Sequence, residues 1–215
     1  MAIKKTILHL HGFASSGHSA KALYLKERLG GIPGVEFLVP DFNPTPRDFE
    51  FMTVTGMINR LRQYILDRNL NNISISASSL GCLLALHYAR IFGEVKKLLL
   101  LAPVLSYSAL PFPEELFVQW EKEGSIKVPH FGFKEDLPLR YDFHRDGLAY
   151  SERVSPPAPV RILHGKNDVT ISIQNSRDYA ADYPDQVTLV EFDSDHALLD
   201  CLDAIGGHAA SFLVS

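Results

Sequence analysis

Short apolar runs alternate with longer amphipathic segments along most of the chain. Six runs are almost continuously apolar, which is typical of strands buried on both faces of a parallel sheet. They span residues 5–11, 35–40, 72–77, 96–103, 159–165 and 186–192. Parallel strands need a crossover between them, so the segments that separate the runs are expected to contain helices.

The intervening segments have the spacing of amphipathic helices. Helices are predicted over residues 19–30, 51–69, 80–93 and 172–183, and again from residue 197. In the second of these, the spacing places Ile58, Leu61, Ile65 and Leu66 on one apolar face. The alternation predicts one α/β domain over residues 1–215, with a six-stranded, mostly parallel sheet covered by helices on both faces.

Residues 104–158 interrupt this rhythm between the fourth and fifth strands. The segment is much longer than a usual connection, and it holds nine aromatic residues and six of the 13 prolines. That composition is too aromatic for a disordered linker. We predict a small cap or lid with an apolar underside; the alternative is a surface excursion that packs on itself.

Composition narrows the classes of partner. The chain is 46% hydrophobic and 21% charged, with a formal net charge of -4, so neither nucleic acid nor an anionic membrane is expected as a partner. No run approaches the roughly 18 apolar residues of a membrane span. The start of the chain is too short and too polar for a signal peptide. Two cysteines make no disulfide framework and favour a reduced, cytoplasmic setting. Oligomeric state is not indicated.

Four serines cluster where the third strand meets the following helix. A nucleophile at such a sharp turn needs small residues two positions before and two positions after it. Ser78 fails this test because Leu80 is bulky, whereas Ser79 has Ala77 and Gly81 at those positions. Ala77 stands where the usual pattern has glycine, a mild steric departure. Ser79 is therefore the candidate nucleophile; the alternative is that it only caps the helix that follows.

A serine nucleophile needs a general base and a group that orients the base. Asp168 follows the fifth strand and His196 follows the sixth. Because the carboxyl ends of parallel strands share one edge of the sheet, Ser79, Asp168 and His196 are expected to meet there. Asp193 and Asp195 compete for the acid role, but they lie so close to His196 in sequence that they are poorly placed to orient its ring.

An oxyanion hole completes this set of requirements. The backbone N–H of Leu80, directly after the candidate nucleophile, is the first expected donor. Gly12 allows the loop after the first strand to turn close to the site, and the N–H of Phe13 is the second expected donor.

Four motifs in order, "HGF", "ASSLG", "HGKND" and "SDH", resemble those of the α/β-hydrolase superfamily. The chain order Ser, Asp, His is also the order of that superfamily. The start "HLHGFASSGHS" and the "SSLG" elbow are similar to its smaller esterase and acyl-thioesterase branches. The resemblance implies hydrolysis of a small-molecule carboxylic ester or thioester through an acyl-enzyme. Amide or carbon–carbon bond hydrolysis stays open, as does a non-catalytic binding protein on the same fold.

Cofactors and metals are not expected. His9 and His11 share one face of a strand and, with His164, make a conceivable zinc site. However, His11 and His164 each stand before a glycine at a strand end, where they shape the loops of the hydrolase arrangement. Cys82 falls inside a predicted helix and is expected to pack against the sheet.

Overall fold

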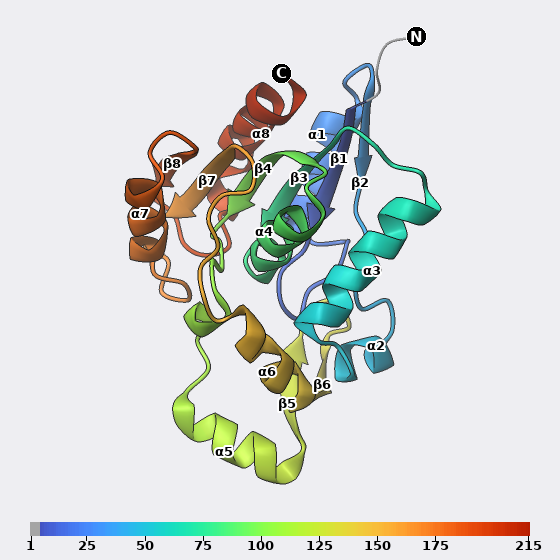
Figure 1. Ribbon diagram of the computed structural model, residues 1–215, viewed down its shortest axis with the longest axis vertical. Helices are drawn as coiled ribbons and strands as arrows, with labels where there is room; N and C mark the ends of the chain where they lie inside the picture. Colours follow the sequence, from blue (N-terminus) through green and yellow to red (C-terminus); the bar gives the residue numbers. More distant parts are fainter. Residues whose placement is uncertain (1–4) are drawn as a thin grey trace.

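The six predicted strands form one parallel sheet in the computed structural model, which describes residues 5–215 (Figure 1). Their spatial order is β2-β1-β3-β4-β7-β8, and every neighbouring pair is parallel. The strands are β1 (Lys5–Leu10), β2 (Val35–Leu38), β3 (Ile73–Ser78), β4 (Val95–Leu101), β7 (Val160–Gly165) and β8 (Val187–Phe192). The predicted α/β class and parallel sheet are confirmed. Residues 1–4 of the predicted domain lie outside the described residues.

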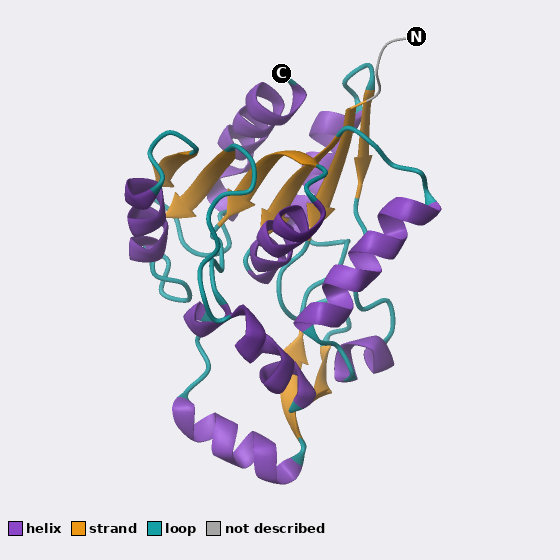
Figure 2. Cartoon of the chain, in the orientation of Figure 1, coloured by secondary structure: helices purple, strands orange, loops and turns teal. Residues whose placement is uncertain are grey.

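Helices cover both faces of the sheet (Figure 2). They are α1 (Ala20–Gly30), α3 (Val54–Asp67), α4 (Leu80–Phe92), α7 (Ile173–Asp182) and α8 (Leu202–Ala209). The short helix α2 (Pro46–Glu50) packs instead beside strand β6 (Glu135–Arg140) of the insertion (Figure 1). Successive strand side chains point to opposite faces, so Leu98 and Leu100 of β4 join the core under α3 and α4, whereas Leu99 and Leu101 join the core under α1 and α8. Burial on both faces explains why the strands are continuously apolar.

The insertion between β4 and β7 forms a small structured unit. It contains a 3₁₀ turn η1 (Tyr107–Ala109), helix α5 (Glu114–Glu123), an antiparallel hairpin of β5 (Ser125–His130) and β6 (Glu135–Arg140), helix α6 (Asp142–Gly147) and a 3₁₀ turn η2 (Leu148–Tyr150). Figure 1 shows α5, β5, β6 and α6 beyond the carboxyl ends of the sheet strands.

Aromatic side chains join this insertion to the loop after β1. The Phe13 ring lies 5.8 Å from the ring of Phe112 and 5.7 Å from that of Phe143, measured between centroids. Trp120 and Phe143 are fully buried, and the Trp120 indole N–H donates to the carbonyl of Leu139 at 2.8 Å. The underside of the insertion is therefore apolar, and aromatic pairs of this kind add to the stability from buried area.

Two details of the helices differ from the expectation. Leu66 is 54% exposed, because it follows Ile65 by a single residue and is rotated about 100° away from the buried face of α3. The short helix α2 was not predicted; Thr45 and Asp48 form a capping box at its start, and five residues are too few for a periodic pattern. Across residues 5–215, no helix has the length and apolarity needed to cross a membrane.

Candidate active site

Ser79 occupies a strained turn between β3 and α4. Its φ of 52° and ψ of -120° are unusual for a residue with a side chain, and the strain directs the side chain away from the sheet. The Ser79 N–H donates to the carbonyl of Leu101 at the end of β4 at 3.0 Å, and the Ser79 carbonyl accepts from the N–H of Val104, three residues after β4, at 3.2 Å. Both hydrogen bonds hold the turn. The Ser79 side chain makes no capping hydrogen bond to α4, which argues against a purely structural cap.

Gly81 allows α4 to start directly against the end of β1. A Cβ atom at this position would lie 2.5 Å from the carbonyl oxygen of Leu10 and 2.7 Å from that of His11. Neither backbone oxygen can move aside as a flexible side chain can. Ala77, the position where the usual pattern has glycine, is fully buried with its methyl group accommodated. The requirement for a small residue is therefore strict at position 81, where only glycine fits, and less strict at position 77, where alanine is accommodated.

The structure brings Ser79, His196 and Asp168 together in one hydrogen-bonded series. The Oγ atom of Ser79 lies 3.1 Å from Nε2 of His196, and Nδ1 of His196 lies 2.7 Å from Oδ2 of Asp168. The Asp168 side chain is fully buried, whereas that of His196 is 25% exposed. This geometry suits a serine hydroxyl, a general base and a carboxylate that orients the base.

Close packing of two loops produces this juxtaposition of Asp168 and His196. A Cβ atom on Gly165 would lie 2.3 Å from the carbonyl oxygen of Ser194, so the turn after β7 and the loop after β8 touch through their backbones. The N–H of Asn167 also donates to the carbonyl of Ser194 at 3.0 Å. The glycine in "HGKND" thus sets the distance between the two loops.

Asp168 accepts more hydrogen bonds than the one from His196. Its Oδ1 accepts from the N–H groups of Thr170 and Ile171 at 2.9 and 2.8 Å, and its Oδ2 lies 3.0 Å from Nε2 of His164. Burial by itself raises the pKa of the Asp168 carboxyl, but hydrogen bonds from His164, His196 and Ile171 outweigh burial and hold the pKa well below its ordinary range. The carboxyl is therefore ionised at neutral pH.

His164 is the residue of this cluster whose role the sequence did not indicate. It was interpreted as a loop-shaping residue, but its ring is fully buried and bridges Asp168 and Ser176. Three residues, 165–167, separate His164 from Asp168 across a turn. One sequence feature could have indicated this role. His164 stands near the end of a buried strand, directly before a glycine and four positions before the carboxylate of Asp168.

Leu80 and the loop that carries Phe13 both adjoin Ser79. Leu80 follows Ser79 directly, and a Cβ atom on Gly12, the residue before Phe13, would lie 3.2 Å from Cβ of Ser79. Within residues 5–215, neither the Leu80 nor the Phe13 amide donates a hydrogen bond to another protein group. The N–H of Phe131, at the tip of the β5–β6 hairpin, donates to the carbonyl of Ala14 at 2.9 Å and supports this loop.

The competing carboxylates have other partners. Oδ1 of Asp195 accepts from the N–H groups of Ala197 and Leu198 at 2.8 and 3.3 Å, which shapes the loop around His196. Oδ1 of Asp193 accepts from the side-chain amide of Asn167 at 3.0 Å. Neither makes a hydrogen bond to the His196 ring, so of these three carboxylates it is Asp168 that contacts the ring.

The histidines of the conceivable zinc site do not converge on one point. Nδ1 of His9 bonds Oγ of Ser76 at 3.1 Å, Nδ1 of His11 bonds the carbonyl of Gly12 at 3.0 Å, and His164 is occupied by Asp168 and Ser176. In the described part of the chain, no three His, Cys, Asp or Glu side chains are placed to hold a metal ion. Cys82, on α4, is fully buried and faces the carbonyl of Leu101 on β4, in the packing position expected for it.

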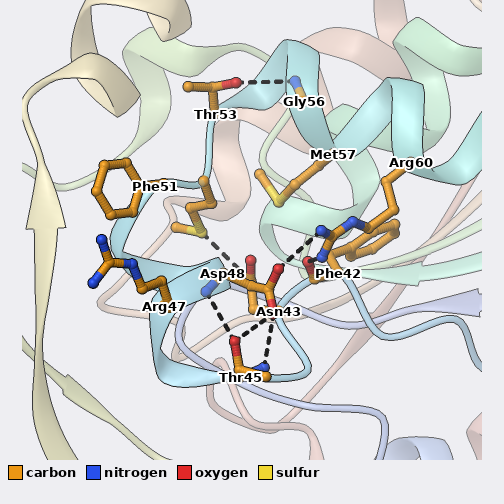
Figure 3. Close-up of a pocket in the computed structure, with 11 residues that line it drawn as sticks. Phe42, Asn43, Thr45, Arg47, Asp48, Phe51, Thr53, Gly56, Met57 and Arg60 are labelled. Carbon is orange, nitrogen blue, oxygen red and sulfur yellow. Dashed lines mark hydrogen bonds and ion pairs between the residues drawn. The ribbon is translucent and has the colours of Figure 1, made fainter.

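Two hollows, neither of them lined by Ser79, Asp168 or His196, lie in other parts of the described structure. One, of about 360 Å³, is formed by α2, α3 and the loop before them (Figure 3); Arg60 there is paired with Asp48 at 2.9 Å and also donates to the carbonyl of Phe42. The other, of about 280 Å³, lies within the insertion and is lined mainly by Tyr107, Leu110, Phe112, Phe117 and His144. Only the second contains a residue, Phe112, whose ring contacts the ring of Phe13.

Solved structures with the same architecture include proteins from bacteria and from mouse. A protein from Agrobacterium vitis S4 has a TM-score of 0.84 at 18% identity, covering 99% of this chain and 88% of that one. Alpha/beta hydrolase domain-containing protein 10 from mouse has a TM-score of 0.77 at 20% identity, covering 96% and 88%. Est1E from Butyrivibrio proteoclasticus with ferulic acid bound has a TM-score of 0.79 at 19% identity, covering 99% and 89%.

These likenesses establish the α/β-hydrolase fold, as the sequence resemblance implied. A family model gives the closer relationship. The model of the uncharacterised protein family UPF0227 matches residues 6–210, and the chain therefore belongs to that family.

Proposed function

We propose that this chain is a serine hydrolase that cleaves a small carboxylic ester or thioester through an acyl-enzyme. The observation that carries the proposal is the hydrogen-bonded series from Ser79 through His196 to Asp168, at 3.1 and 2.7 Å. A binding protein on this fold has no need of a strained serine that is hydrogen-bonded to a histidine held by an ionised carboxylate.

The proposed reaction has two halves. In the first, Oγ of Ser79 attacks the carbonyl carbon while Nε2 of His196 takes the hydroxyl proton; collapse of the tetrahedral adduct breaks the ester or thioester bond, and His196 gives its proton to the leaving oxygen or sulfur. In the second, His196 takes a proton from water, the hydroxide attacks the acyl-enzyme, and Ser79 regains its proton as the acid departs. Asp168 remains ionised throughout and stabilises the imidazolium.

The amides of Leu80 and Phe13 are the proposed oxyanion donors. Leu80 follows Ser79 directly, Phe13 follows the close approach of Gly12 to Ser79, and neither amide donates to another group among residues 5–215. One donor of this kind is worth on the order of a hundredfold in rate or more, because it meets charge that develops only in the transition state.

The insertion over residues 104–158 is the proposed lid over the acyl group. Its hollow is lined largely by aromatic and aliphatic side chains, and Phe112 connects this hollow to the Phe13 loop. A volume of about 280 Å³ suits an acyl or aryl group of moderate size. Est1E, of the same fold, has been solved with ferulic acid, an aryl carboxylic acid, bound to it, which supports a substrate of this chemistry.

Comparing Ser79→Ala with Ser78→Ala tests the proposal. Ser78 is a buried neighbour in the same turn, so it controls for damage to the elbow. On p-nitrophenyl esters we expect Ser79→Ala to lose at least about a thousandfold in kcat and Ser78→Ala to keep most of it. A fluorophosphonate probe should label wild type and Ser78→Ala but not Ser79→Ala.

Equal losses in the two variants would place the nucleophile elsewhere, and an unlabelled Ser79 in folded wild-type protein would leave a non-catalytic role. A panel of esters, thioesters and amides of increasing acyl length then defines the substrate class. Cleavage of amides in preference to esters and thioesters would contradict the proposed bond type.

A further inference from the structure

We propose that His164 is a positioning residue that fixes the Asp168 carboxylate toward His196. The proposal rests on the proposed function, in which His196 is the base. Nε2 of His164 and Nδ1 of His196 approach the same oxygen of Asp168, Oδ2, at 3.0 and 2.7 Å. His164 is on β7 and His196 follows β8, so the carboxylate is held from two elements.

The contacts of His164 define which of its nitrogens carries a proton. Nε2 lies 3.0 Å from Oδ2 of Asp168 and 3.1 Å from the carbonyl oxygen of Ile171, and both of these groups only accept hydrogen bonds. Nε2 must therefore be protonated and donate to both. Nδ1 lies 2.7 Å from Oγ of Ser176, a fully buried hydroxyl on α7. Ser176 thus fixes the ring orientation from the opposite side.

Without His164, Oδ2 of a buried carboxylate would lose one of its two partners. The two oxygens of Asp168 receive four hydrogen bonds, two from backbone amides to Oδ1 and two from histidines to Oδ2. The Asp168 side chain is fully buried, so water does not replace a lost donor. His196 would then be the remaining partner of Oδ2 among these four donors, and the carboxylate would be held toward it less firmly.

Charges from other elements also face this pair. Lys21 of α1 interacts with Asp168, and Glu191 of β8, paired with Arg177 at 2.7 Å, lies beside His164. Lys21 and Glu191 are still present in a His164 variant. If substituting His164 changes the pH dependence of the reaction, the change is therefore due to loss of the imidazole N–H and not to a change in these surrounding charges.

Loss of the His164 donor changes the proton affinity of His196 in a defined direction. A hydrogen bond to Oδ2 disperses the negative charge of the carboxylate, which weakens its hold on the His196 proton. When that bond is removed, Asp168 attracts the proton on His196 more strongly. The base is then protonated at higher pH, and the acid limb of the pH–rate profile moves upward.

Three substitutions separate this role from simple packing. His164→Met fills the site without a donor, His164→Gln keeps a terminal N–H near the position of Nε2, and His87→Met removes another buried histidine that does not contact Asp168. For His164→Met we expect kcat to fall by about tenfold or more with little change in KM, and the acid limb to move to higher pH. His164→Gln should restore most of the wild-type kcat and most of the wild-type position of the acid limb. His87→Met should change neither kcat nor the acid limb.

An NMR titration of the His196 ring, without substrate, provides a readout that does not depend on turnover. We expect its midpoint to move to higher pH in His164→Met and to return toward wild type in His164→Gln. If wild type hydrolyses no ester but this shift is present, the proposed function fails and the positioning role stands. An unchanged midpoint and acid limb in folded His164→Met would overturn the positioning role. Should His164→Met not fold, His164→Asn, whose shorter amide does not reach Oδ2, gives the same comparison.

Discussion

Gly81 sets how closely α4 approaches β1 behind Ser79. Because a methyl group there would lie 2.5 Å from a backbone oxygen, Gly81→Ala must push the start of α4 away from the sheet. We expect the substitution to lower the free energy of unfolding by about 3 kcal/mol and to abolish ester hydrolysis, since Ser79 and the Leu80 amide move with the helix. Urea denaturation and p-nitrophenyl ester turnover measure the two effects.

Ala77→Gly is the matched control on the other side of Ser79. It restores the usual glycine of the elbow pattern and removes only one buried methyl group from β3. We expect it to cost about 1 kcal/mol and to retain activity. Losses of equal size in Gly81→Ala and Ala77→Gly would show that the distance to β1 is not what limits position 81.

Single residues of the site differ in how well a sequence can reveal them. Ser79, Asp168 and His196 were predictable as neighbours because each follows a buried strand of a parallel sheet, whose strand ends share an edge. The structure has all three within hydrogen-bonding distance in series. The part played by His164 was not predictable, because it depends on a turn that folds Asp168 back over the strand from which it has just emerged.

Helix α6 anchors the insertion to the main domain through α3. The carboxylate of Asp146 accepts from the N–H of Thr55 at 2.8 Å and from its hydroxyl at 2.6 Å, and Tyr150 bonds the same hydroxyl at 2.7 Å. A carboxylate at the first turn of a helix also interacts favourably with the helix dipole. This contact therefore ties the proposed lid to a helix of the main domain.

Asp146→Ala should loosen the insertion without unfolding the sheet. Removing two hydrogen bonds to a charged group costs about 1–2 kcal/mol locally, so we expect faster amide hydrogen exchange over residues 142–150 and an increase in KM. Asp142→Ala is the control, because Asp142 pairs only with the exposed side chains of Arg140 and Arg145. Faster exchange throughout the sheet, or equal effects in both variants, would contradict an anchor at Asp146.

The helices and strands that have an uninterrupted hydrophobic pattern in the sequence were predictable, and the elements that lack such a pattern were not. The four inner strands β1, β3, β4 and β7 are largely buried on both faces and appear as nearly continuous apolar runs. The edge strands β2 and β8 are only partly buried, but their apolar residues still mark them in the sequence. The β5–β6 hairpin is half exposed, and Pro129 and Pro138 within it argue against a strand, since proline is tolerated mainly at sheet edges. A two-stranded sheet has only edges, so the structure accommodates both prolines.

At the scale of the whole molecule, the parallel sheet brings together the candidate site residues, which follow four different strands. Phe13 follows β1, Ser79 follows β3, Asp168 follows β7 and His196 follows β8. These residues are far apart in the chain, so the site depends on the integrity of the entire sheet. Conditions that destabilise the fold will therefore remove activity even when no site residue is altered.

Low pH is one such condition, and we expect a buried histidine of strand β1 to contribute to the loss of stability in acid. His9 is fully buried on β1 with its Nε2 unpartnered. Burial, with Lys21 and His11 nearby, lowers the pKa of His9 to about 3, whereas an unfolded chain gives histidine a pKa of about 6.5. Between these values the unfolded chain binds a proton that the folded chain does not, so stability falls as the pH drops below about 6.5.

His9→Gln should reduce this loss of stability in acid. From pH 7 to pH 4 the His9 contribution corresponds to about 3 kcal/mol, and His87, whose pKa burial lowers to about 4, acts in the same direction. We expect urea denaturation at pH 7, 5.5 and 4 to show a clearly shallower decline in His9→Gln than in wild type, whatever the variant's stability at pH 7. His18→Gln is the control, because that side chain is exposed in the folded protein. Parallel declines in wild type and His9→Gln would mean that His9 becomes protonated without unfolding, and that the space beneath β1 accommodates its charge.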